Sequence, residues 1–127
     1  MRKYILLVSS LFFLLASGWV AAGTVDEDSM QLMKDKQTSL SSNISLNNAK
    51  GATADAEEIL DMFGDVEEFF TKKGNAQDAL DWTKQSKDLL ASIVKNVGSK
   101  NFDIAAQTSV TLAKTCKECH AIYKKDK

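Results

Sequence analysis

The sequence predicts an all-α fold, an antiparallel four-helix bundle, from three observations. Apolar residues recur three or four positions apart over long stretches, which is the period of an amphipathic helix. No stretch alternates polar and apolar residues as a strand would, and the chain contains no proline. Gly51, Gly74 and Gly98 are spaced as the ends of helices. Four such helices with short connections bury one stripe each against a common core.

The first helix is expected from about Asp26 to Asn48. The second is expected to begin near Thr53, where an acidic turn follows. Gly64 is expected to end or kink it, with an apolar patch at Val66, Phe69 and Phe70 on a looser continuation. The residues expected to face inward from these two helices are Met30, Met33, Gln37, Leu40, Ile44, Ala56, Ile59, Leu60 and Phe63.

The third helix is expected from about Ala76 to Val97, after Asn75 as a starting signal. The last is expected from about Asn101 to Lys124, capped by Ser99 or Asn101. The inward residues predicted here are Ala79, Thr83, Ser86, Leu90, Ile93 and Val97, flanked by Trp82 and Leu89, and then Phe102, Ala105, Ser109, Leu112, Ala113 and Cys116. Because so many of these side chains are small, the bundle would be only marginally stable by itself. A large apolar cofactor would supply the missing buried surface.

The first 22 residues are predicted to be a signal peptide. A short basic start precedes an uncharged run up to Val20, and Val20-Ala21-Ala22 fits the small-residue cleavage rule. An uncleaved membrane anchor is the alternative, because the run is close to the length that spans a bilayer. With cleavage after Ala22, residues 23–127 form one exported, periplasmic domain without stable membrane insertion.

The charges are nearly balanced, with 16 basic and 17 acidic residues. No basic patch is interleaved with aromatic residues, so a nucleic-acid partner is not expected.

Five lysines gather near the carboxyl end. They either steer an acidic redox partner or form a solvated helix end that suits the helix dipole. They are Lys114, Lys117, Lys124, Lys125 and Lys127.

The most informative motif is Cys116-Lys117-Glu118-Cys119-His120, which holds both cysteines and the only histidine of the chain. The pattern C-x-x-C-H indicates covalent attachment of a c-type haem. In a helix, positions i, i+3 and i+4 share one face, so Cys116 and Cys119 would form thioethers while His120 ligates the iron as the proximal ligand. We therefore expect one covalent haem c near the carboxyl end.

Three other uses of this motif are weaker. A structural zinc site needs four ligands, and the motif supplies three on one helical turn. A thioredoxin-type redox pair stands near a βαβ pattern with its thiolate at a helix start, whereas this pair lies late in a helix. A disulfide between Cys116 and Cys119 would close a very small loop and leave His120 without a role.

The position of the motif at the end of a fourth helix resembles the class II c-type cytochromes, the cytochrome c' family, whose members are four-helix bundles. The resemblance extends over the mature chain but rests on few positions. They are Lys114-x-Cys116-Lys117-x-Cys119-His120-x-x-Tyr123-Lys124, Trp82, and the pair Met33-Lys34.

This resemblance implies that the residue facing the distal side of the haem is Met33. Five-coordinate members have a non-ligating apolar residue there, and the low-spin branch, which is favoured here, has a methionine that ligates iron. Met30 and Met62 are rivals, and a buried methionine also serves as ordinary core filler. Many members carry an arginine near the haem propionates where this chain has Ser29, so the register of the first helix is open.

The function expected is that of an exported monohaem cytochrome, a one-electron carrier and not an enzyme, serving periplasmic redox proteins. The alternative is a five-coordinate haem protein that binds nitric oxide or carbon monoxide, if Met33 does not ligate. A thiol-disulfide protein without haem is the third candidate. The resemblance adds a homodimer through the first two helices, to which Leu32 and Leu46 would contribute.

Overall fold

A computed structural model describes residues 25–123, in which four helices and no strand are present. The helices are α1 (Glu27–Ser45), α2 (Ala49–Lys73), α3 (Gln77–Gly98) and α4 (Phe102–Tyr123). The prediction of an all-α four-helix fold is confirmed. The predicted signal peptide of residues 1–22 lies outside the described residues, as do Lys124, Lys125 and Lys127.

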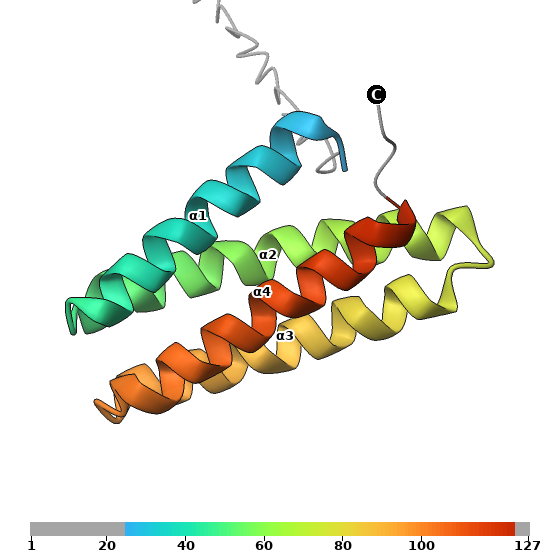
Figure 1. Cartoon of the computed structure of the whole chain (residues 1–127). Helices are drawn as coiled ribbons and strands as arrows, with labels where there is room; N and C mark the ends of the chain where they lie inside the picture. Colours follow the sequence, from blue (N-terminus) through green and yellow to red (C-terminus); the bar gives the residue numbers. More distant parts are fainter. Residues whose placement is uncertain (1–24, 124–127) are drawn as a thin grey trace, which may run out of the picture.

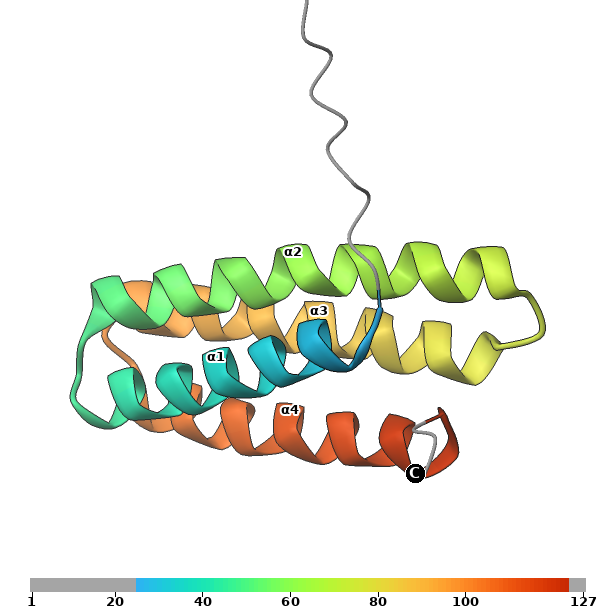
Figure 2. The same ribbon diagram turned by 90° about the horizontal axis from the view of Figure 1, so that it is seen from above.

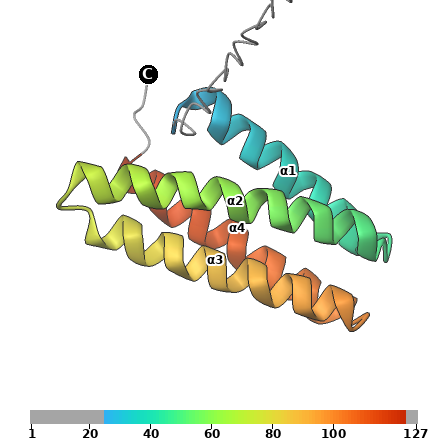
Figure 3. The same ribbon diagram turned by 180° about the vertical axis from the view of Figure 1, so that it is seen from behind.

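The helices pack in a ring of contacts, in which α1 and α3 each contact both α2 and α4 (Figure 1). The α1–α2 and α3–α4 connections lie at one end of the bundle and the α2–α3 connection at the other (Figure 2). Figures 1 and 3 both show the amino-terminal end of α1 standing apart from the other three helices. The backbone of α1 therefore diverges from the bundle toward its amino-terminal end, where Val25, Met30 and Met33 still pack against the core.

No helix within residues 25–123 is both long enough and apolar enough to cross a membrane.

Local hydrogen bonds explain where α1 and α2 begin. The Asp26 carboxylate accepts from the Ser29 backbone N–H at 2.8 Å, and Ser29 Oγ accepts from the Asp26 N–H at 3.0 Å, which together form a capping box. Asn48 caps α2 by accepting from the Gly51 N–H at 3.1 Å. The first helix starts close to the predicted position, and the second starts before it.

The predictions that Gly51 and Gly64 interrupt the helices are wrong. Asn47 supplies the left-handed residue of the turn, with φ of 54°, so Gly51 is free to enter the first turn of α2. A Cβ at Gly51 would lie 2.6 Å from the Asn48 side chain and 2.8 Å from that of Asn43, so glycine permits a close approach there. Gly64 is exposed within an unbroken helix, while Gly74, with φ of 71°, ends α2 as predicted.

The core consists of one stripe from each helix, largely as the periodicity predicts. All six inward residues predicted for the third helix are buried, and so are Met33, Leu40 and Ile44 of the first. Of the apolar patch expected at Val66, Phe69 and Phe70, Val66 and Phe70 are buried and Phe69 is 42% exposed. Six other residues expected inside are only half-buried: Met30, Gln37, Leu60, Phe102, Ala113 and Cys116.

A polar cluster joins α1 to α2 near their connection. The buried carboxylate of Asp55 accepts from Ser39 Oγ at 2.6 Å and from Asn43 Nδ2 at 2.8 Å. Lys36 pairs with Glu58 at 2.6 Å one turn away. Because a buried carboxylate is stable only when donors surround it, these contacts fix the carboxyl-terminal half of α1 on α2.

Two leucines near the carboxyl end of α1 test this account of the core. Leu40 is 0% exposed and Leu46 is 74% exposed. We expect Leu40→Ala to lower the free energy of unfolding by about 2–5 kcal/mol, because it leaves a cavity. Leu46→Ala should change it by less than about 0.5 kcal/mol. Urea denaturation followed by circular dichroism measures both, and equal losses in the two variants would contradict the packing described.

Candidate functional site

The inward face of α4 determines where the C-x-x-C-H motif lies. Ala105, Ser109 and Leu112 of this face are buried in the bundle. One and two turns further along, Cys116 and Cys119 are half-buried and pack against the same core. His120 lies at the exposed edge of α4, in its last turn. The structure therefore directs both thiols inward and leaves the imidazole accessible to solvent.

Two side-chain contacts define how α1 lies against α4. Ser41 Oγ and Ser109 Oγ are 3.1 Å apart, and the Cys116 thiol donates to Gln37 Oε1 at 3.8 Å. The second contact lies nearer the amino end of α1 and nearer the carboxyl end of α4 than the first. One further turn leads to Met33 on α1 and to the turn of α4 that carries His120.

Met33 and its rivals Met30 and Met62 meet at one groove between α1 and α2, near the amino end of α1. Its volume is about 230 Å³, and Met33 beside it is only 7% exposed. Met30 lies two turns before Gln37, so it shares the edge of α1 that faces α4. The residues around the groove are Val25, Ser29, Met30, Leu32, Met33, Met62, Asp65 and Val66. All three methionines considered from the sequence are thus neighbours.

Both thiols are held in their neutral form. Burial, and secondarily the neighbouring Cys119, raise the pKa of the Cys116 thiol from 9.0 to about 11. Burial also raises the pKa of Cys119, and the negative charge of Asp78 acts in the same direction. The carboxyl end of a helix disfavours an anion as well. A reactive thiolate of the thioredoxin kind has a lowered pKa, so this site has the opposite electrostatics.

One contact at this site was missed by the sequence analysis. The Tyr123 hydroxyl donates a short hydrogen bond to the Asp78 carboxylate, which also accepts from the Ala79 backbone N–H at 2.9 Å. The bond to Asp78 raises the pKa of Tyr123 to about 12. Asp78 and Tyr123 are 45 positions apart, and no local pattern in the sequence links them.

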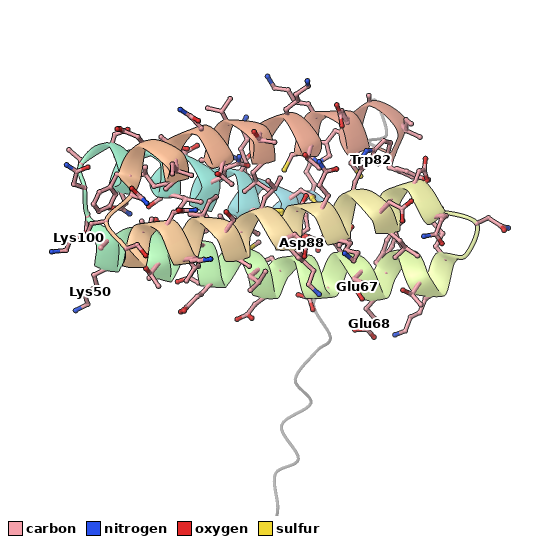
Figure 4. All side chains as sticks on the ribbon, turned by 90° about the horizontal axis from the view of Figure 1, so that it is seen from below. Lys50, Glu67, Glu68, Trp82, Asp88 and Lys100 are labelled. Atoms are coloured by element: carbon pink, nitrogen blue, oxygen red, sulfur yellow. The ribbon has the colours of Figure 1, made fainter. Side chains whose placement is uncertain are left out.

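Aromatic rings close this end of the bundle. The rings of Phe70 and Tyr123 meet edge to face, with centroids 4.9 Å apart, and Phe69 packs on Phe70 at 5.1 Å. Trp82 is half-buried at the same end, whereas Lys50 and Lys100 lie at the opposite end (Figure 4). The turn of α4 that carries His120 is therefore packed against both α2 and α3.

The donor set of this site suits a c-type haem. Two inward thiols, an accessible imidazole and a buried thioether are the groups that attach and ligate such a cofactor. The groove of about 230 Å³ is smaller than pockets that hold small molecules, so side chains between α1 and the rest of the bundle must move to admit a porphyrin.

Within residues 25–123, no group of three or more His, Cys, Asp or Glu side chains is arranged to hold a metal ion. Ser29, which stands where the resembling family has an arginine, uses its hydroxyl in the capping box of α1.

No protein-family model matches the chain, and no curated protein or solved structure shows significant similarity to it.

The raised pKa of Cys116 predicts slow alkylation of the folded chain. In a Cys119→Ser variant without haem, burial, the larger cause of the raised pKa of Cys116, remains. The Cys116 thiol should therefore react with iodoacetamide at neutral pH at least about tenfold more slowly than in the same variant in urea, because only the thiolate reacts. The rate in the folded protein should keep rising with pH toward 11. Mass spectrometry measures both rates, and equal rates with and without urea would contradict the burial of this thiol.

Proposed function

We propose that the protein is an exported monohaem c-type cytochrome that carries single electrons. The observation that supports this most is the arrangement of α4, which turns Cys116 and Cys119 toward the core at the level where α1 presents Met33. A haem attached there would supply one iron that gains and releases an electron. The full proposal is an antiparallel bundle of the class II type, with its haem near the carboxyl end.

Each side chain has a distinct part in this proposal. Cys116 and Cys119 hold the cofactor through thioethers, so occupancy no longer depends on affinity. His120 is the proximal ligand, and its place in the last turn of α4 keeps it near solvent. Met33 is the distal ligand, a soft thioether that raises the potential of a histidine-ligated iron. Because His120 and Met33 would both ligate the iron, no position would remain for a substrate, which would favour electron transfer over turnover.

The thiol-disulfide alternative has less support. A redox-active pair needs a thiolate at neutral pH, and both thiols here have raised pKa values. The exposed Lys114 precedes the motif and the exposed Lys117 lies within it, which suits a periplasmic redox protein with an acidic surface as the partner. The proposal includes a homodimer to which Leu32 and Leu46 would contribute, and these two side chains are 51% and 74% exposed.

The optical spectrum of the protein exported to an oxidising compartment tests the proposal. We expect a Soret band that stays with the chain after denaturation, and low-spin bands in the reduced state that carbon monoxide does not alter. Cys116→Ser should weaken or alter attachment, and His120→Ala should remove normal ligation. A spectrum without a Soret band in protein from a strain able to attach haem would contradict the proposal.

A pair of methionine substitutions identifies the distal ligand. Met33→Ala should give high-spin haem that remains covalently attached and binds carbon monoxide, because the axial position opens. Met30→Ala removes a thioether from the same groove and should leave the low-spin spectrum unchanged. The reverse pattern would assign Met30 instead. High-spin haem in the unmodified protein would favour the alternative function, the binding of nitric oxide or carbon monoxide.

A further inference from the structure

The end of α4 is tied to the start of α3 by one side-chain pair. The Tyr123 hydroxyl donates to Asp78 Oδ1, and the same oxygen accepts from the Ala79 backbone N–H. Asp78 lies in the first turn of α3, where the helix dipole favours a negative charge. Tyr123 is the last residue of α4, three positions after His120. The pair therefore joins the turn that carries the histidine to a fixed point on another helix.

The same hydrogen bond fixes where the charge of Asp78 lies. Tyr123 is three positions after His120, so the bond places the Asp78 carboxylate beside the turn of α4 that carries the proposed iron ligand. A haem ligated by His120 would lie near this charge. Reduction adds an electron to a haem, and a nearby negative charge opposes that addition.

We propose that Asp78 and Tyr123 are positioning residues for the haem: their hydrogen bond holds the His120 turn of α4 in place, and the charge of Asp78 lowers the reduction potential of the iron. The inference rests on the proposed function. It assigns two separable effects to one pair, because the bond depends on the Tyr123 hydroxyl and the potential depends on the Asp78 charge.

Two isosteric substitutions separate the effects in the haem-loaded protein. Asp78→Asn removes the charge but keeps a side-chain oxygen that accepts from Tyr123. Tyr123→Phe removes the hydroxyl but keeps the ring that packs on Phe70. Asp88→Asn is the matched control, since it removes the same charge from α3 at an exposed position paired with Lys84, farther along the helix (Figure 4).

Redox titration measures the effect of the charge. With Asp78→Asn, the ratio of reduced to oxidised haem at a fixed applied potential should rise about fivefold, as expected for one charge lost at a partly solvated site. Added salt should make this change smaller. Asp88→Asn and Tyr123→Phe should change the ratio much less. Equal changes in the two Asp→Asn variants would overturn the proposed role of the Asp78 charge.

Hydrogen exchange measures the effect of the bond. Tyr123→Phe should speed the exchange of backbone amides in the last turn of α4 several-fold, with exchange in the middle of the helix unchanged. Unchanged exchange in that turn would overturn the positioning role.

If all four proteins lack covalent haem, the proposed function fails together with the predicted effect on the reduction potential. If haem is present and the variants match the unmodified protein, only this inference fails.

Discussion

The structure depends on the burial of one stripe of α4 between α1 and α3. Ala105 and Leu112 are fully buried, which sets the rotation of the helix about its axis. Once that rotation is set, the helical repeat directs Cys116 and Cys119 toward the core and brings His120 to the exposed edge. The orientation of the motif is thus set first by core packing one to three turns before it, at Leu112 and Ala105.

The two ends of α1 are held by different kinds of interaction. In its carboxyl-terminal half, Ser39 and Asn43 attach it to the Asp55 carboxylate of α2 through polar contacts that require a defined geometry, and at its middle Lys36 pairs with Glu58. Around Met33 it is held by thioether and aliphatic packing, which tolerates rearrangement. This difference agrees with a cofactor site at the Met33 end, because apolar packing can adapt to a large flat group more readily than a buried carboxylate can.

The sequence predicted the helices well and their boundaries less well. The third-helix stripe was fully predicted because its repeat is regular and no glycine interrupts it. The start of α2 was missed because Asn47 forms the turn and Asn48 caps the helix. Gly51 lies inside α2, where the absence of a side chain lets α1 approach closely. A glycine after a lysine is a poor stop signal where an asparagine before it already supplies the left-handed residue, as Asn47 does before Gly51.

The candidate site was predictable only as far as local patterns reach. The motif and its helical face follow from the spacing of Cys116, Cys119 and His120. The groove at Met33 depends on how α1 lies against α2, and the Asp78–Tyr123 bond joins residues 45 positions apart. Such contacts arise from the packing of whole helices, which a single sequence does not encode in any short pattern.

The most direct test of the central claim is the intact mass of the mature protein, isolated from the oxidising compartment and measured under denaturing conditions. Thioether bonds survive denaturation, so the account predicts the mass of residues 23–127 increased by one haem, and no increase when both Cys116 and Cys119 are replaced by serine. The mass of the chain alone, lowered by the two hydrogens of a Cys116–Cys119 disulfide, would contradict it.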